Sequence, residues 1–287
     1  MTPMAQAPID QIGRPEAGSL DRPQAAILLI GNELLSGKIR DENGWFLTQV
    51  CRRRGVAVRE IAVVPDELDA IGEALWRMLH AAPLLFTSGG VGPTHDDVTM
   101  EAIARATGRP IVRDPEMEAL LRKHYAERST EAALRMADVP QGTLLRALPG
   151  WPIMRLDLAA GEQLGGRALA HDARIYILPG IPALLRAKVD ALEDLPGELP
   201  QIREWALVVL HTRLEESALA GPLDAVVAEF EEVEIGSYPR WDADADGRLR
   251  VRVKVTFEAG THARALAARD ALAARLDPTD LLERDPE

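Results

Sequence analysis

The feature that most constrains this chain is a short apolar run that ends in a glycine-rich turn. Leu84–Ser88 is too short for a helix and leads directly into Gly89–Gly92, which holds three glycines. Two adjacent carboxylates, Asp96 and Asp97, follow, and a helical pattern begins at Val98. This order predicts a strand, a glycine turn and the start of a helix.

The chemistry of this stretch favours a phosphate ligand. Glycines permit positive φ angles and close approach of the backbone, and a helix start presents free N–H groups. Asp96 and Asp97 would repel a phosphate by themselves, so a divalent cation between acid and phosphate is expected. In an alternative interpretation Asp97 only caps the helix, which contributes about 1 kcal/mol. Asp96 beside it cannot cap the same turn.

Composition excludes several classes of protein. The chain has 287 residues, a net charge of −12 and a pI near 5.1, so we expect no non-specific nucleic-acid binding. Cys51 is the single cysteine, which rules out an internal disulfide and fits a cytoplasmic location. No apolar run is long enough for a membrane helix. Residues 1–24 are expected to form a flexible leader, neither a signal peptide nor a membrane anchor.

The hydrophobic pattern alternates between buried strands and amphipathic helices, which predicts right-handed crossovers and a parallel sheet. The first part of the chain is expected to run from 25 to 196. Its predicted strands are 25–30, 56–64, 84–88 and 173–178, with short extended pieces in 142–158. Its predicted helices are 41–54, 65–79, 98–107, 114–127, 129–137 and 182–195.

The alternation of buried strands and amphipathic helices ends at residues 196–200, where two prolines and a glycine suggest a linker. The second part, 201–276, is expected to be a small α+β domain with mixed or antiparallel pairing. Its predicted strands are 205–211, 233–238 and 249–257, and its predicted helices are 215–230 and 261–276. We interpret 242–247 as an acidic turn and 277–287 as a frayed tail.

Ligands of parallel sheets bind at the carboxyl ends of the strands. Gly31–Gly37, Asp66 and Gly89–Asp97 all follow predicted strands of the first part and therefore share this edge. Each has a plainer interpretation as well, because Gly31-Asn32 suits an ordinary turn and Asp66 suits a helix N-cap. The turn at Pro179-Gly180 either faces the same crevice or only reverses the chain.

Four stretches together resemble one known family: Thr87–Thr99, Gly31–Gly37, Tyr176–Pro182 and Ile235–Pro239. The chain resembles the molybdopterin-binding, MoaB/MogA-like, domain family over roughly residues 24–275. Within it, the sequence is most similar to the branch found in competence/damage-inducible protein A and at the amino end of eukaryotic FAD synthases. The resemblance implies a three-layer αβα domain with a mainly parallel sheet, and a homo-oligomer.

The resemblance also implies function. Members bind molybdopterin or its adenylylated form, or hydrolyse the pyrophosphate of ADP-ribose or FAD-like dinucleotides with a divalent metal such as Mg²⁺, Mn²⁺ or Co²⁺. The leading hypothesis is therefore a cytoplasmic, metal-dependent pyrophosphatase. The alternatives are a protein that binds molybdopterin or adenylyl-molybdopterin, and a non-enzymatic scaffold that binds a nucleotide and regulates a partner.

The family motifs assign roles to residues of this chain. The metal-linked and catalytic acid would be Asp97, helped by Asp96 or Asp66. The phosphate would bind to the backbone N–H groups and side chains of Ser88, Gly89, Gly90, Gly92 and Thr94. The nucleotide-facing positions would be Asn32, Glu33, Asn43, Pro179 and Gly180.

Two departures limit what the family implies here. Related proteins carry an amidase-like or adenylyl-transferring domain that is not expected in this chain, so neither deamidation nor FAD synthesis is implied. Many members of the competence branch have Gly-Thr-Ala-Pro-Gly where this chain has Pro149–Ile153. We therefore expect different substrate contacts on that side of the site.

Overall fold

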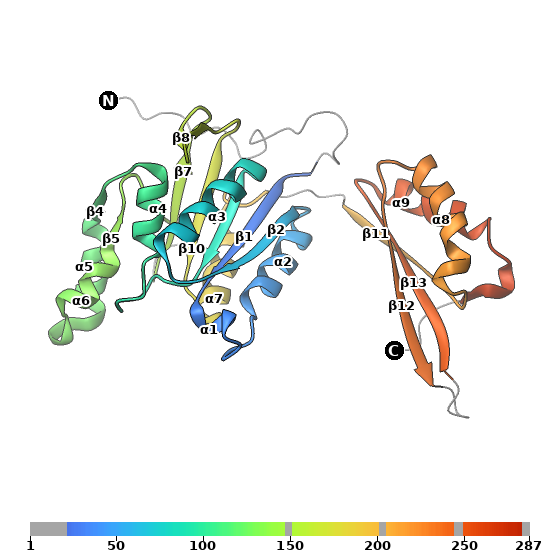
Figure 1. Cartoon of the computed structure of the whole chain (residues 1–287), viewed down its shortest axis with the longest axis horizontal. Helices are drawn as coiled ribbons and strands as arrows, with labels where there is room; N and C mark the ends of the chain where they lie inside the picture. The colour runs from blue at the N-terminus through green and yellow to red at the C-terminus, as the bar shows by residue number, and fades with distance from the viewer. Residues whose placement is uncertain (1–21, 147–150, 201–204, 244–248, 283–287) are drawn as a thin grey trace. The chain divides into compact units, whose positions relative to one another are not determined.

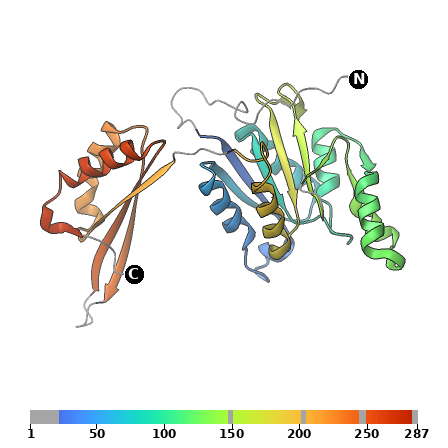
Figure 2. The ribbon, with the colours of Figure 1, turned by 180° about the vertical axis from the view of Figure 1, so that it is seen from behind.

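The structure is a computed structural model that describes residues 22–146, 151–200, 205–243 and 249–282. The chain forms two compact units, Met1–Gln201 and Ile202–Glu287 (Figures 1 and 2). Residues 1–21 of the predicted leader 1–24 lie outside the described residues. Gln24, its last residue, is instead the first residue of a strand. Each unit is built around its own sheet and core.

The first unit contains a six-stranded sheet in the order β2-β1-β3-β10-β7-β6. Neighbouring strands pair in parallel from β2 to β10, and β7 and β6 pair antiparallel at one edge. Its strands are β1 (Gln24–Ile30), β2 (Ala57–Val64), β3 (Leu84–Ser88), β10 (Ala173–Leu178), β7 (Ile153–Leu158) and β6 (Leu144–Arg146). The mainly parallel sheet expected from the sequence is confirmed.

Helices cover both faces of this sheet and make a three-layer domain (Figure 1). Helices α3 (Leu68–Ala81) and α4 (Thr99–Thr107) pack on one face, where Leu28 of β1 belongs to the same core. Helices α2 (Asn43–Arg53) and α7 (Pro182–Glu193) pack on the other face, where Ile27 of β1 contributes. Strand β1 is buried on both sides because successive side chains enter opposite cores.

Several predicted boundaries were wrong for local reasons. The helix predicted from residue 41 begins at Asn43, because Asp41 Oδ1 accepts hydrogen bonds from the N–H groups of Asn43 and Gly44 at 2.9 Å each. The loop predicted after β1 contains a short helix, α1 (Asn32–Leu35). The helix predicted over 129–137 is only α6 (Glu131–Leu134) and a 3₁₀ turn, because the chain then enters a strand.

Smaller elements flank the sheet. Strands β4 (Ile111–Arg113) and β5 (Asp138–Pro140) form one antiparallel pair, which encloses helix α5 (Pro115–Tyr125) and α6 in the chain. Strands β8 (Gln163–Leu164) and β9 (Arg167–Ala168) form a second pair. The sequence did not predict these strands, since runs of two or three residues are too short to show periodicity.

The second unit is a four-stranded antiparallel sheet in the order β12-β13-β11-β14, with two helices against one face. Its strands are β11 (Ala206–Thr212), β12 (Glu234–Ala243), β13 (Leu249–Ala259) and β14 (Leu281–Leu282), and its helices are α8 (Glu216–Glu229) and α9 (His262–Ala273). The small α+β domain is thus confirmed. The acidic turn predicted at 242–247 lies outside the described residues from 244 onward.

Two segments that were predicted to be a frayed tail and a linker make ordered contacts in the structure. The tail predicted from 277 pairs instead with β11 through Leu281 and Leu282, and residues 283–287 lie outside the described part. In the predicted linker 196–200, Glu198 is only 1% exposed and accepts two hydrogen bonds from Arg155 Nη1, at 2.9 Å each. This segment is therefore anchored to the first unit by a buried ion pair.

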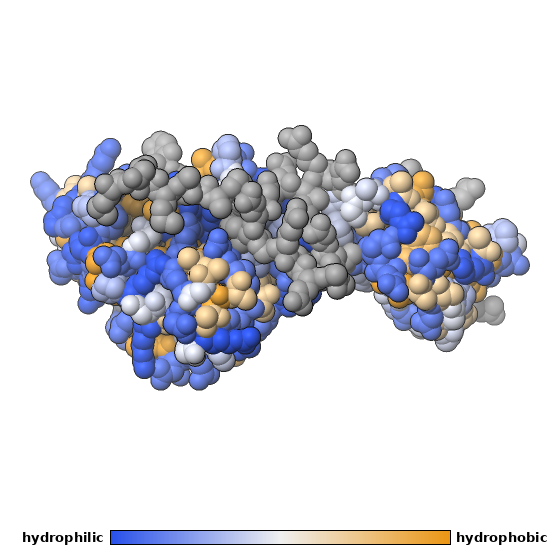
Figure 3. Space-filling view, turned by 90° about the horizontal axis from the view of Figure 1, so that it is seen from above, coloured by the Kyte–Doolittle hydropathy of each residue, from blue (hydrophilic) through white to orange (hydrophobic). Residues whose placement is uncertain are grey.

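The surface that Figure 3 shows is a mosaic in which hydrophilic residues predominate and hydrophobic residues form patches between them. Within the described ranges, no helix combines the length and the apolar character that a membrane crossing requires.

Candidate functional site

The first unit brings the predicted site segments to one edge of its sheet. The parallel strands β1, β2, β3 and β10 all have their carboxyl ends there. Each of them leads into one of the segments singled out in the sequence: 31–37, 65–66, 89–97 and 179–180. Their position at the carboxyl edge of the sheet is confirmed.

The turn after β3 has room for glycine alone at two positions. Gly89 has a φ of 109°, and a Cβ atom there would lie 2.1 Å from the backbone oxygen of Ile30. Gly90 has a φ of 63°, and its Cβ would lie 2.3 Å from Thr99 Oγ1. That hydroxyl donates to the carbonyl oxygen of Gly89 at 2.9 Å, so the first residue of α4 clamps the turn.

The N–H groups of this turn differ in availability. The N–H of Gly89 donates to the carbonyl of Leu178 at 3.2 Å and is not available to a ligand. The N–H groups of Gly90, Val91 and Gly92 have no hydrogen-bond partner among the residues that the structure describes. Gly89 therefore shapes the turn, and the next three amides are the donors that an anion can use.

The two acids after the turn share one hydroxyl. Thr94 Oγ1 lies 2.6 Å from Asp96 Oδ1 and 2.5 Å from Asp97 Oδ2, and the backbone N–H of Thr94 donates to Asp97 Oδ2 at 2.7 Å. The hydrogen bond from Thr94 holds the pKa of Asp96 below its ordinary value. A hydroxyl donates a single proton, so one of the two carboxylates always lacks it.

These carboxylates fit a hard divalent cation. Asp97 Oδ1 accepts no hydrogen bond from any described residue and stays available as a ligand atom. In the described ranges no three His, Cys, Asp or Glu side chains converge as a metal site. Mg²⁺ commonly binds to one or two carboxylates and completes its shell with water and substrate phosphate. The donor set thus suits a cation shared with the phosphate of a ligand.

Four of the predicted residues meet in one hydrogen-bonded cluster. Asn43 Nδ2 donates to Ser88 Oγ at 3.0 Å and to the carbonyl of Gly180 at 2.7 Å. Ser88 Oγ in turn donates to the carbonyl of Pro179 at 3.2 Å. A Cβ on Gly180 would lie 3.3 Å from the Cα of Gly89, so this turn packs on the glycine turn. The cluster joins α2 to the ends of β3 and β10.

Asp66, Asn32 and Glu33 lie on the β2 side of the edge. Asp66 Oδ2 accepts a hydrogen bond from the N–H of Asn32 at 2.8 Å and so caps α1. The interpretation of Asp66 as the cap of α3 was wrong, since Glu67 occupies that position. The Glu33 carboxylate folds over Gly31, where a Cβ would lie 2.5 Å from Glu33 Oε1. Asp66 thus positions the loop that carries Asn32 and Glu33.

One basic residue near the glycine turn was missed in the sequence. Arg135 Nη2 donates to the carbonyl of Pro93 at 3.3 Å, and the side chain of Arg135 is exposed. No local pattern marks this residue, because it lies 42 positions from Pro93, in the 3₁₀ turn that follows α6. It adds a positive charge next to the turn that would receive an anion.

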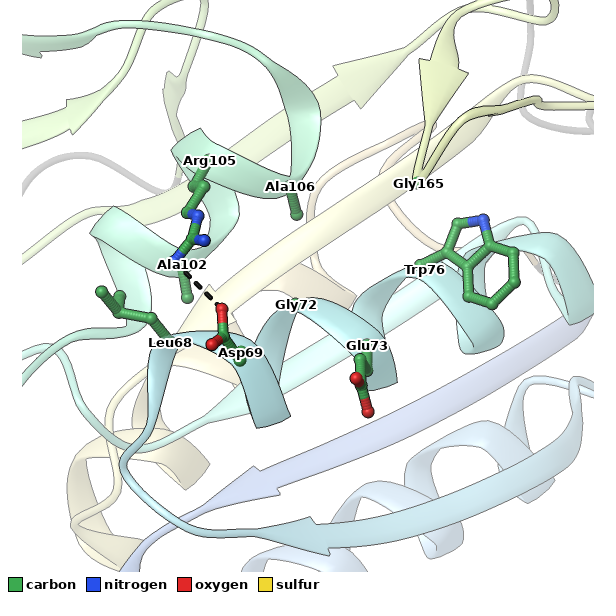
Figure 4. Close-up of a pocket in the computed structure, with 9 residues that line it drawn as sticks. All are labelled: Leu68, Asp69, Gly72, Glu73, Trp76, Ala102, Arg105, Ala106 and Gly165. Atoms are coloured by element: carbon green, nitrogen blue, oxygen red, sulfur yellow. Dashed lines mark ion pairs between the residues drawn. The ribbon is translucent and has the colours of Figure 1, made fainter.

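A separate cavity lies away from the residues of this edge. It has a volume of about 490 Å³ and lies between α3, α4 and the turn at Gly165, as Figure 4 shows. Asp69 and Arg105 form an ion pair across it at 3.0 Å, and Trp76 lies at one end beside Gly165 (Figure 4). None of the predicted site residues lines this groove. We therefore place the candidate site at the carboxyl edge of the sheet.

Several known proteins are similar to this chain. Protein Ta0487 of Thermoplasma acidophilum is 31% identical over 218 residues, which cover 75% of this chain and 80% of that protein. A probable FAD synthase of Caenorhabditis elegans is 32% identical over 235 residues, which cover 76% of this chain but only 44% of that protein. The crystal structure of a Thermoplasma acidophilum protein titled CinA, with unknown function, superposes with a TM-score of 0.52 at 31% identity, over 60% of this chain and 96% of the other.

Two family models match consecutive parts of the sequence. The model described as FAD synthase, middle domain, matches residues 205–285, which form most of the second unit. The model described as probable molybdopterin binding domain matches residues 26–196, which hold the six-stranded sheet and every predicted site residue. The chain therefore belongs to the molybdopterin-binding domain family that its glycine turn had suggested.

Proposed function

We propose that this protein is a metal-dependent hydrolase that cleaves the pyrophosphate of a nucleoside-diphosphate-linked small molecule, of the ADP-ribose or FAD type. One observation carries the proposal. The backbone amides of Gly90–Gly92, which have no hydrogen-bond partner among the described residues, lie in the same loop as two carboxylates that share the hydroxyl of Thr94. The loop offers donors for a phosphate and ligands for a cation within eight residues, 90–97.

In this proposal the amides of the loop bind the phosphate, and its carboxylates bind the cation. The amides of Gly90, Val91 and Gly92 donate to phosphoryl oxygens, and they are fixed before the ligand arrives because Thr99 holds the turn. Asp97, with Asp96, holds the divalent cation. A cation bound there supplies charge neutralisation for the diphosphate and polarises a phosphoryl oxygen. Arg135, beside Pro93, adds attraction for the anionic substrate.

The test is release of AMP. Purified protein is incubated with ADP-ribose and, separately, with FAD, each with Mg²⁺, Mn²⁺ or Co²⁺, and the products are separated by chromatography. We expect AMP from at least one substrate in the presence of metal and none when EDTA removes the metal. If no metal supports AMP release from either substrate, the hydrolase proposal fails.

A second candidate is a protein that binds molybdopterin or its adenylylated form, which the description of the family model favours. The same amides would then receive the pterin phosphate. The two functions differ in what accompanies the purified protein. A fluorescent pterin that co-purifies, and that is lost in Gly90→Val, would support this second function, whereas AMP release supports the first.

A further inference from the structure

The four-stranded sheet of the second unit has one face without a helix among the described residues of that unit. Helices α8 and α9 both lie on the same side of the sheet (Figure 1), where they pack with Val253 and Phe257 of β13. Successive side chains of a strand point to opposite faces, so Lys254 and Thr256 lie on the other face. We call this second face, formed by β11, β12 and β13, the open face.

The open face is acidic at one end of its strands and basic at the other. Strand pairing sets Glu234 beside Glu258 in an acidic row, and Arg240 beside Arg252 in a basic row. Lys254 adds a positive charge next to the basic row. The two rows are separated by roughly 20 Å, since each residue of a strand adds about 3.4 Å. Salt screens charges beyond about 8 Å, so neither row neutralises the other.

Apolar side chains lie on the same face. Tyr238 is 54% exposed, and its ring lies over Gly236, where a Cβ atom would lie 2.9 Å from the Tyr238 hydroxyl oxygen. In β11, Leu207 is 44% exposed, and Val209 follows on the same face. Exposed apolar side chains that are bordered by charged residues mark surfaces that contact another protein. The open face therefore has the composition of a docking surface.

The charge pattern identifies a second copy of this chain as the partner. A two-fold dimer joins the same patch of both copies, so the patch must complement itself. A two-fold axis that crosses the strands midway between the two rows places Glu258 of one copy opposite Arg252 of the other. The same axis places Glu234 opposite Arg240. Sheets that pack face to face keep their strands within about 30° of each other, which keeps these rows aligned.

Other arrangements fit this pattern less well. An axis along the strands would set like charges opposite each other, and the acidic row would repel a polyanion such as a nucleic acid. We propose that the open face joins two copies of this chain in a two-fold dimer, with the acidic row of each copy on the basic row of the other. The side chains of both rows also interact within their own chain, and the proposal needs only the net charge of each row.

The opposed rows make the dimer sensitive to salt and to charge reversal. Sedimentation equilibrium of the unaltered chain should show a dissociation constant that rises about tenfold or more when NaCl is raised from about 50 to about 500 mM. Arg252→Glu and Glu258→Arg each set like charges opposite each other across the axis. Each should halve the mass of the assembly at a protein concentration at which the unaltered chain is associated.

A mixture of the two variants tests the two-fold pairing itself. In a mixed pair, Glu258 of the Arg252→Glu chain meets Arg252 of the Glu258→Arg chain, and the two substituted positions also carry opposite charges. The mixture should therefore associate again, and native mass spectrometry identifies the mixed dimer because the two variant chains differ in mass. Damage that a substitution causes within its own chain is not repaired by mixing.

A matched control changes the same charge on the other side of the sheet. Asp224→Arg lies at an exposed position of α8, alters the net charge as Glu258→Arg does, and should keep the dissociation constant within twofold. The proposal is overturned if the unaltered chain is monomeric at every concentration, or if both variants of the rows keep its assembly mass. It is also overturned if the variants dissociate and their mixture stays dissociated. The salt series uses the unaltered protein and decides the matter even if a variant does not fold.

Discussion

Asp97→Asn is expected to lower kcat/KM for AMP release from ADP-ribose by about 100-fold or more, with little change in stability. Asparagine keeps a side-chain oxygen that accepts from the N–H of Thr94, which Asp97 Oδ2 does at 2.7 Å. The substitution removes the negative charge that would hold the cation. A 100-fold loss corresponds to about 2.7 kcal/mol, within the several kcal/mol that a catalytic metal supplies.

The control for this prediction is another Asp→Asn change in the same unit. Asp69 has a side chain that is 83% exposed, pairs with Arg105 and lies in the groove of Figure 4, away from the glycine turn. Asp69→Asn is expected to retain activity within twofold. If the Asp97→Asn and Asp69→Asn proteins are equally active, Asp97 has no catalytic role.

Glu198→Gln is expected to lower the free energy of unfolding by about 3 kcal/mol or more. Glu198 and Arg155 have side chains that are 1% and 2% exposed, and Arg146 also donates to the Glu198 carboxylate. Breaking a buried ion pair typically costs about 3–5 kcal/mol, and the lower end of this range is expected because Arg155 keeps Asp157 as a second partner at 2.7 Å. Urea unfolding at pH 7, followed by circular dichroism, measures the change.

The contribution of Glu198 to the free energy of unfolding is expected to decrease at low pH. Burial alone would raise the pKa of this carboxyl, but hydrogen bonds and charges from Arg155 and Arg146 outweigh burial and hold the pKa below its ordinary value of 4.5. A depressed pKa in the folded state contributes stability above the unfolded pKa and loses it as the pH falls through the folded pKa. The difference between wild type and Glu198→Gln should therefore shrink below about pH 4.5.

An exposed ion pair provides the comparison. Glu60 and Arg77 pair at 2.6 Å with side chains that are 31% and 53% exposed, and ion pairs in contact with solvent contribute at most about 1 kcal/mol. Glu60→Gln should therefore destabilise the protein by less than about 1 kcal/mol. If Glu198→Gln costs no more than Glu60→Gln, segment 196–200 is not held by the buried ion pair and acts as the linker that its composition suggested.

The parts of the fold that the sequence predicted well are those governed by local pattern. The continuous apolar run before Gly31 could only be a strand buried on both faces, and the glycines at 89 and 90 do adopt positive φ angles. The order of strands and helices then placed the loops at one edge, since parallel strands share their carboxyl ends. The position of the candidate site follows from these local signals.

The parts that the sequence could not predict depend on contacts between distant residues. Asn43 meets Gly180 across 137 positions, and Arg155 meets Glu198 across 43. Neither pairing leaves a periodic signal. Segment 196–200 was interpreted as a linker because its prolines and glycine are typical of one, and composition does not reveal that a carboxylate is buried against an arginine.

The crystal structure of the protein with Mg²⁺ and methylene-bridged ADP-ribose tests the central claim most directly. We predict that the diphosphate lies against the backbone amides of Gly90–Gly92 and that Asp97 is a ligand of the cation. A diphosphate bound away from this turn, for example in the groove between α3 and α4, would contradict the account.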